Sequence, residues 1–162
     1  MKTILLIGAC GSGKTYVMKQ LLNNLETKNA KIGLFRFCID ENKNIAILGV
    51  YDGSTFEGSD KLSMGIMKDV ELMRKLQIAK NITLVCEGDR FTNSTFIKTF
   101  EPIIIKISDK GEKGRRLRNS TQSERHIKAI QTRVDNIKEH YLVNNSSEAL
   151  ELVKSKLFNE KN

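Results

Sequence analysis

The sequence is poor in residues that mark several protein classes: its 162 residues include one proline, three cysteines and two histidines. The single proline and eleven glycines exclude a collagen-like chain, and apolar runs between charged residues exclude a disordered one. No apolar stretch approaches the roughly 18 residues that a membrane-spanning helix needs. The apolar run before Gly8 is too short for a signal peptide. We therefore expect a globular protein of the cytoplasm.

Cysteine and histidine are also too sparse to hold a metal ion together. Cys10, Cys38 and Cys86 lie far apart and form no C-x-x-C pair, and His126 and His140 are isolated. We therefore predict reduced thiols, no zinc site, and surface or packing roles for both histidines.

Positive charge is present in excess, and most of it lies in one segment. The 27 basic and 19 acidic residues give a net charge of +8. Residues 106–138 hold ten basic residues against four acidic ones, a local net of +6, so the rest of the chain is close to neutral. This asymmetry predicts a polyanionic partner, either the phosphates of a nucleotide or a nucleic-acid backbone.

Short apolar runs alternate with segments of helical periodicity along the chain. Strands are predicted at 3–7, 82–86, 103–107 and 141–143, a β-hairpin at 31–51, and helices at 14–27, 66–78, 95–100, 122–140 and 146–157. Ser146 or Ser147 is the expected N-cap of the last helix. The alternation predicts one α/β domain over residues 1–162, in three layers: a mostly parallel five-stranded sheet with helices on both faces, plus the hairpin as an insertion.

A glycine-rich motif follows the first predicted strand and precedes the first predicted helix. Residues 8–15, Gly-Ala-Cys-Gly-Ser-Gly-Lys-Thr, match the P-loop pattern G-x-x-x-x-G-K-[ST]. Glycines let successive N–H groups point at one phosphate, and the helix directs its positive end to the same place. Lys14 is expected to bind the β- and γ-phosphates and Thr15 to ligate Mg²⁺. The predicted nucleotide-binding residues are Gly8, Cys10, Gly11, Ser12, Gly13, Lys14 and Thr15.

Charged side chains follow the strand predicted at 82–86, in the sequence Glu87-Gly88-Asp89-Arg90. Because the carboxyl ends of parallel strands meet at one crevice, these side chains should face the phosphates held by the first loop. Glu87 or Asp89 can hold Mg²⁺ or orient an acceptor hydroxyl, and Arg90 can bind an acceptor anion. Which carboxylate has which role stays open, and a solvated polar loop is the alternative.

The polar loop after the predicted hairpin is a third candidate. Asp52, Phe56 and Asp60 lie in it together with hydroxyl side chains, a combination that suits a nucleobase or a sugar. Asp52 is the candidate general base for an acceptor hydroxyl, whereas a phosphate acceptor would need none. An ordinary Asp-Gly turn explains the same residues equally well.

The basic segment contains a candidate lid at about 109–125. Its arginines could close over the transferring phosphoryl group, exclude water and neutralise charge. Two glycines within residues 110–114 suit a hinge. The alternative is a basic face in contact with solvent. The candidate lid arginines are Arg115, Arg116, Arg118 and Arg125.

In the order of these motifs and predicted elements along the sequence, the chain resembles P-loop kinases of the nucleoside- and nucleotide-kinase branch. The cluster at 87–90 is similar to the Asp-Arg after the corresponding strand in thymidylate-kinase-like enzymes. Compactness and a composition rich in Lys and Asn are also similar to phage-encoded kinases, some of which phosphorylate DNA or modified bases within it. The resemblance implies a P-loop kinase-like fold, acceptor binding by Arg90, and lid roles for Arg115, Arg116 and Arg118. The hairpin at 31–51 departs from the helical acceptor-binding insertion usual in this branch.

Two functional classes follow. The first is a kinase that uses ATP and Mg²⁺ to phosphorylate a nucleotide-type acceptor, with a nucleoside, a nucleotide and a polynucleotide end or base all open. The second is a non-kinase ATPase or nucleotide-binding module. For the kinase, the predicted catalytic residues are Lys14, Asp52, Glu87, Asp89, Arg115, Arg116 and Arg118. The predicted metal ligands are Thr15, Glu87 and Asp89, and the predicted acceptor-binding residues are Asp52, Phe56, Asp60, Arg90 and Arg125, partly within an insertion at about 31–65.

Overall fold

The computed structural model describes residues 1–54, 56–117 and 121–159. Its strands are β1 (Thr3–Gly8), β2 (Lys28–Ile32), β3 (Phe35–Asp40), β4 (Ile45–Leu48), β5 (Thr83–Glu87), β6 (Ile103–Ile107) and β7 (Tyr141–Val143). Its helices are α1 (Lys14–Leu22), α2 (Val70–Lys80), α3 (Ser94–Phe100), α4 (Glu112–Leu117), α5 (Glu124–Asp135) and α6 (Ser146–Lys154). Short 3₁₀ turns occupy Ser59–Lys61, Ile66–Asp69 and Asp89–Thr92, and a π-helical turn, Ser155–Asn159, follows α6.

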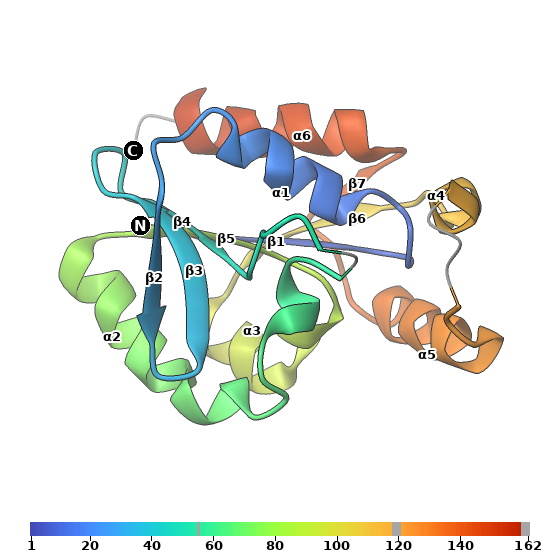
Figure 1. Cartoon of the computed structure of the whole chain (residues 1–162), viewed down its shortest axis with the longest axis horizontal. Helices are drawn as coiled ribbons and strands as arrows, with labels where there is room; N and C mark the ends of the chain where they lie inside the picture. The colour runs from blue at the N-terminus through green and yellow to red at the C-terminus, as the bar shows by residue number, and fades with distance from the viewer. Residues whose placement is uncertain (55, 118–120, 160–162) are drawn as a thin grey trace.

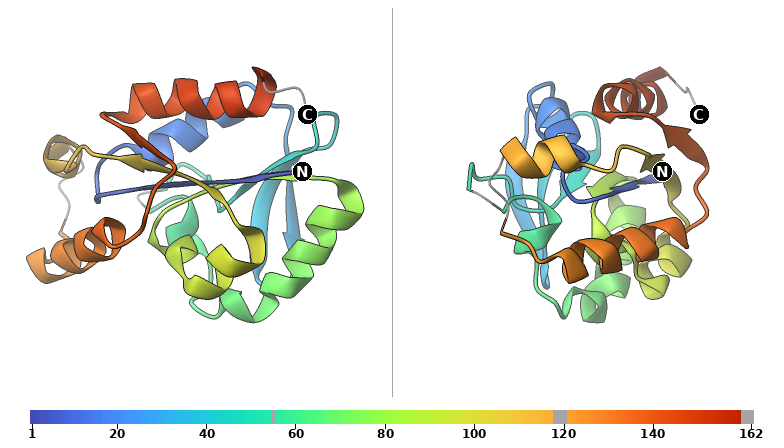
Figure 2. Two further views of the ribbon diagram at one scale, coloured as in Figure 1. Left: turned by 180° about the vertical axis from the view of Figure 1, so that it is seen from behind. Right: turned by 90° about the vertical axis from the view of Figure 1, so that its right-hand side faces the viewer.

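The strands form one mixed sheet with the order β2-β3-β4-β5-β1-β6-β7. Neighbours from β4 to β7 pair in parallel, whereas β2 and β3 are antiparallel to their neighbours. Helices α1 and α6 cover one face, and α2, α3 and α5 cover the other (Figure 1; Figure 2). The predicted α/β class is therefore confirmed, but the sheet has seven strands and not the five that we expected.

The region of the predicted hairpin contains a turn that the hydrophobic pattern does not reveal. The hairpin was expected from residue 31 to 51, but the chain already reverses at Gly33 and Leu34, so that β2 pairs with β3 and three strands, β2 to β4, join the sheet. Gly33 has a φ of 54°, which glycine adopts at little cost. The N–H of Leu34 donates to Asp69 Oδ2 at 2.7 Å, so a distant side chain stabilises the turn.

The central strand β1 is buried on both faces, as its continuous apolar sequence predicts. Ile4 and Leu6 pack with residues of α1 and α6, and Leu5 and Ile7 pack with residues of α2, α3 and α5. No helix in the described part of the chain is both long and apolar enough to cross a membrane. The rigid core thus holds the carboxyl ends of β1 and β5 side by side.

Several element ends differ from the expected ones by up to five residues. Helix α1 ends at Leu22, earlier than the expected residue 27, and α5 begins after the N-cap Ser123. Helix α6 has Asn145 as its N-cap and not Ser146 or Ser147, because Asn145 Oδ1 accepts from two N–H groups of the first turn at 3.0 Å. A larger difference lies in the candidate lid, where residues 112–117, for which no helix was predicted, form α4.

Candidate functional site

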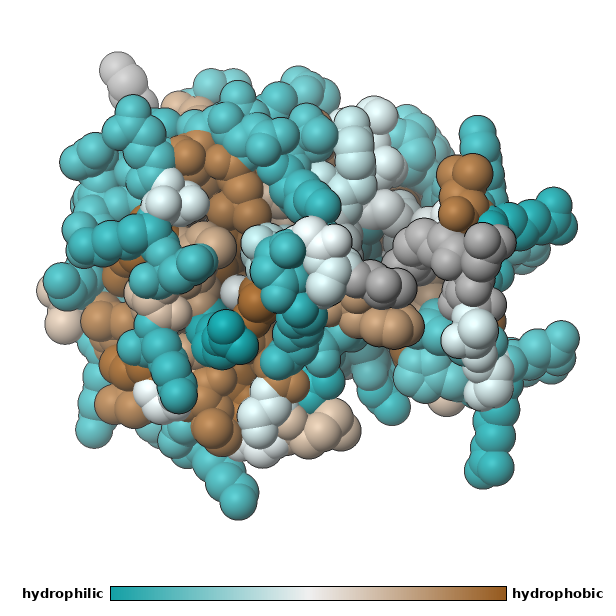
Figure 3. All heavy atoms as spheres, viewed as in Figure 1, coloured by the Kyte–Doolittle hydropathy of each residue, from teal (hydrophilic) through white to brown (hydrophobic). Residues whose placement is uncertain are grey.

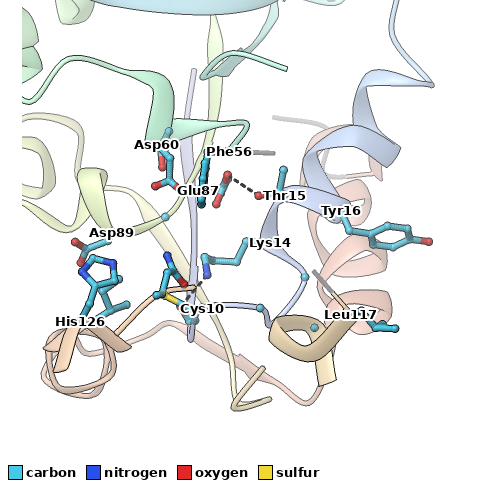
Figure 4. Close-up of a pocket in the computed structure, with 18 of the residues that line it drawn as sticks. Cys10, Lys14, Thr15, Tyr16, Phe56, Asp60, Glu87, Asp89, Leu117 and His126 are labelled. Carbon is cyan, nitrogen blue, oxygen red and sulfur yellow. Dashed lines mark hydrogen bonds between the residues drawn. The ribbon is translucent and has the colours of Figure 1, made fainter. Parts of the chain in front are cut away.

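A cleft of about 510 Å³ opens at the carboxyl ends of β1 and β5 (Figure 4). One wall consists of the glycine-rich loop (residues 8–13), the start of α1 and the end of β5, and the other consists of α4, Thr121, Gln122 and α5. The cleft is lined by Gly8, Cys10, Gly11, Gly13, Lys14, Thr15, Tyr16, Phe56, Ser59, Asp60, Glu87, Gly88, Asp89, Gly114, Leu117, Thr121, Gln122, His126 and Ile130.

The glycine-rich loop turns through two left-handed residues, Gly11 with φ 84° and Gly13 with φ 91°. Within the described residues, the N–H groups of both glycines donate no hydrogen bond. Between them, the N–H of Ser12 donates to the carbonyl oxygen of Ala9 at 3.2 Å. Unpaired N–H groups on a glycine-rich loop that leads into a helix can bind an anion.

Lys14 brings a full positive charge to the same loop. Its Nζ donates to the carbonyl oxygens of Gly8 at 2.9 Å and Ala9 at 2.8 Å. The loop therefore holds the ammonium group at the cleft, where Lys14 is one of the lining residues. Of the predicted nucleotide-binding residues, only Ser12 does not line the cleft. Its buried hydroxyl has no hydrogen-bond partner in the described part of the chain.

Thr15 and Glu87 meet at the floor of the cleft. The Thr15 hydroxyl donates to Glu87 Oε1 at 3.2 Å (Figure 4), as expected for residues that follow adjacent parallel strands. Glu87 is 3% exposed. Burial raises the pKa of Glu87 to about 7, although the charge of Lys14 opposes this shift. Two oxygen donors of this kind suit a hard divalent cation such as Mg²⁺, which takes one or two protein ligands and completes its shell with phosphate and water.

The residues after Glu87 point in different directions. Asp89 lines the cleft and forms an ion pair with Arg133 of α5. Arg90 is not among the lining residues: its guanidinium donates to Met64 Sδ at 2.8 Å. In this structure the Arg90 guanidinium is therefore not positioned to bind an acceptor anion in the cleft.

The polar loop that follows β4 contributes only part of the predicted acceptor site. Phe56 and Asp60 line the cleft, and Phe56 is 53% exposed. Asp52 lies outside the lining residues and forms an ion pair with Lys61. The hydrogen bond from Lys61 holds the pKa of Asp52 well below its usual range. The structure thus brings Phe56 and Asp60 to the site and leaves Asp52 on the surface.

Within the candidate lid, residues 112–117 form the short helix α4. Arg115 points its guanidinium at backbone carbonyl groups, and neither Arg115, Arg116 nor Arg125 lines the cleft. Arg116 and Arg125 are exposed to solvent. Arg118 lies outside the described residues.

Sequence reasoning missed one residue of the first wall, Tyr16, and several of the second. His126, interpreted as a surface or packing residue, is exposed and lines the cleft, and so does Leu117. Tyr16 follows the motif directly, and this position could have indicated it. His126 and Leu117 carry no such signal, because they reach the cleft only through the folding of α4 and α5 across the sheet edge.

No group of three or more His, Cys, Asp or Glu side chains that could hold a metal ion by themselves occurs in the described residues. No protein-family model and no curated protein matches the sequence. The geometry of the cleft is therefore the basis for assigning a function.

Proposed function

We propose that the protein is an ATP-dependent phosphotransferase that moves the γ-phosphoryl group of ATP-Mg to a nucleotide-type acceptor, on a P-loop kinase-like fold. One observation carries the proposal. The unpaired N–H groups of Gly11 and Gly13, the Lys14 ammonium group and the Thr15–Glu87 pair all border one cleft. This set offers donors for phosphate oxygens and oxygen ligands for a cation at adjacent positions.

Each residue has a distinct role in the proposed reaction. The loop N–H groups bind and orient the phosphate chain, and Lys14 leaves its carbonyl partners to bind the β- and γ-phosphates. Thr15 and Glu87 would hold Mg²⁺, directly or through water. When bound, Mg²⁺ supplies charge neutralisation for the phosphate oxygens. In the transfer, an acceptor oxygen bonds to the γ-phosphorus, the bond to the β,γ-bridging oxygen breaks, and ADP leaves.

The acceptor side of the cleft suits a nucleotide. Phe56 presents an exposed aromatic ring on which a base can stack, and Asp60 adds a carboxylate near Glu87. A hydroxyl acceptor must lose a proton, and Asp60 is placed to take it, whereas a phosphate acceptor needs no base. Asp60 thus replaces Asp52 as the candidate base.

A polynucleotide is the second candidate acceptor, and the surface charge favours it. Lys113 and Arg116 on α4, and Arg125 and Lys128 on α5, are all exposed beside the cleft. Long hydrophilic side chains extend from the end of the molecule that holds these two helices (Figure 3). One nucleotide needs only two or three cations, so the surplus charge suits a longer anion.

The proposal is tested by transfer of labelled γ-phosphate from ATP-Mg to nucleosides, nucleotides, and single- and double-stranded DNA. We expect turnover that requires an acceptor, and we expect Lys14→Ala to reduce it at least 100-fold. The matched control is Lys98→Ala, which removes an exposed lysine from α3. ATP hydrolysis without phosphate transfer, or full transfer by the Lys14→Ala variant, would contradict the proposal.

A further inference from the structure

Helix α4 packs directly on the backbone of the glycine-rich loop. The contact consists of Gly11, Gly111 and Gly114, which we call the glycine seam. A Cβ atom on Gly111 would lie 2.1 Å from the carbonyl oxygen of Cys10, and one on Gly114 would lie 2.1 Å from that of Gly11. A Cβ atom on Gly11 would lie 2.4 Å from the carbonyl oxygen of Gly111. The close approach of the two backbones therefore requires glycine on both sides.

Arg115 connects the same two segments by hydrogen bonds. Its Nη1 donates to the carbonyl oxygen of Cys10 at 2.7 Å and to that of Lys110 at 2.6 Å. The backbone N–H of Arg115 donates to the carbonyl oxygen of Gly111 at 3.0 Å. The guanidinium thus joins the loop to the segment that leads into α4.

The position of the Cys10 carbonyl group affects the phosphate site. In a trans peptide, the C=O of one residue and the N–H of the next point in opposite directions, and the described chain has no cis peptide bond. Because Arg115 holds the Cys10 oxygen, the N–H of Gly11 must point away from the Arg115 guanidinium. This N–H is one of the two unpaired donors of the loop.

We infer that Arg115 is a positioning residue for nucleotide binding: with the glycine seam, it fixes the peptide groups of the glycine-rich loop in the orientation that phosphate requires. This inference rests on the proposed function. It differs from the role expected from the sequence, in which Arg115 would touch the transferring phosphoryl group. Preorganised donors raise affinity because the loop need not be ordered on binding. Removal of Arg115 therefore weakens nucleotide binding and leaves the chemical step largely intact.

The first experiment compares Arg115→Met, Arg115→Lys and Lys75→Met. Lys75 is the control, because it is an exposed cation of α2 that does not line the cleft. The Kd for ATP-Mg is measured by calorimetry without acceptor, and kcat is measured at saturating ATP. For Arg115→Met we expect a Kd about tenfold higher, because one charge-assisted hydrogen bond is lost. We expect a kcat within about threefold of that of the original protein. Arg115→Lys should restore part of the affinity, because an ammonium group can also donate to the Cys10 carbonyl oxygen.

A second experiment tests the seam with Gly114→Ala and the control Gly65→Ala. A Cβ atom on Gly65 would have its nearest neighbour at 3.8 Å, and its φ of −85° suits alanine. Alanine favours a helix over glycine, so a helix effect alone would leave Gly114→Ala as stable as the original protein or more stable. We expect the opposite: a lower melting temperature and a Kd for ATP-Mg at least tenfold higher, with no change for Gly65→Ala.

The outcomes separate this inference from the proposed function. A large loss of kcat with an unchanged Kd for Arg115→Met would show that Arg115 acts on the transferring group, and unchanged values of both would show that it has no role; either result overturns the inference. If the Arg115 variants change the Kd for ATP-Mg as expected but the original protein transfers no phosphate, the inference stands and the proposed function fails. If Gly114→Ala does not fold, the Arg115 variants decide alone.

Discussion

The two walls of the cleft differ in how they present charge. The wall formed by β1, β5 and α1 has few charged groups, and Glu87 among them is buried against Thr15. The wall formed by α4 and α5 has many, but Arg116, Arg125 and Lys128 are exposed. Buried charges interact strongly and specifically, whereas exposed charges are screened by water and salt. The first wall is therefore suited to chemistry at defined atoms, and the second to attraction of an anion.

Glu87→Gln should have the largest effect, because it changes the buried wall. The amide keeps the shape of the side chain but removes the negative charge proposed to hold Mg²⁺. We expect phosphate transfer to fall about 100-fold, with a smaller loss at high Mg²⁺ concentration. The measurement is kcat/KM for ATP across a magnesium titration. Glu71→Gln, which changes an exposed glutamate of α2, is the control. Unchanged kcat/KM would remove Glu87 from the site.

The Glu87→Gln variant should be more stable than the original protein at high pH. The folded protein raises the pKa of Glu87 to about 7 from an ordinary 4.5, mainly by burial. A raised carboxyl pKa means that the folded state binds the proton more tightly, so stability is lost as the pH rises from about 4.5 through 7. We expect Glu87→Gln to abolish this loss and to gain roughly 3 kcal/mol or less of unfolding free energy at pH 8. The unfolding free energy of both proteins is measured by urea unfolding at pH 5 and pH 8, in the absence of magnesium. A parallel pH dependence in both proteins would contradict the assigned shift.

An intermediate effect is expected from the exposed wall. Replacing Lys113, Lys128 and Lys138 by Gln removes three exposed cations of the basic segment. For binding of a single-stranded oligonucleotide, the slope of the logarithm of the association constant against the logarithm of the salt concentration should decrease in magnitude by about 2. Fluorescence anisotropy at several salt concentrations measures the slope. Replacing Lys68, Lys75 and Lys98 by Gln removes the same charge from the turn at Ile66–Asp69, from α2 and from α3, and serves as the control. Equal slopes in both variants would show that the basic segment is only a solvated face.

The smallest effect is expected from Asp52→Asn. Asp52 is paired with Lys61 and lies outside the residues that line the cleft. We expect kcat for a hydroxyl acceptor to change less than about twofold, whereas the loss of a general base costs about 100-fold or more. Asp60→Asn, measured beside it, should show the larger loss. The reverse order of the two variants would restore Asp52 as the candidate base.

The sequence predicted the buried wall better than the exposed one, for a physical reason. The motif that ends at Lys14 and Thr15 is local, and the rule that parallel strands end at one edge places Glu87 beside it. The position of Arg115 could not be predicted in this way. Its partner, the Cys10 carbonyl oxygen, lies 105 positions earlier in the chain, and a backbone acceptor leaves no signature in side-chain chemistry.

The secondary structure also has parts that local sequence patterns predicted and parts that they did not. The alternation of apolar runs and helical periodicity predicted β6 with its observed ends, because Ile103–Ile107 is apolar enough to define a buried strand. The turn at Gly33 was missed, since a single glycine within a strand-like run is compatible with a bulge, a bend or a reversal. Its stabilising partner, Asp69, is a tertiary contact that local patterns do not contain.

The glycine-rich loop depends on late parts of the chain on both of its flanks. Gly11 contacts Gly111 and Gly114, and a Cβ atom on Gly13 would lie 2.7 Å from Ser146 Cβ, at the start of α6. A ribosome releases the N-terminal end first, so the loop emerges long before the residues that enclose it. The loop can therefore reach its enclosed conformation only after the residues that flank it, up to Ser146, have been synthesised.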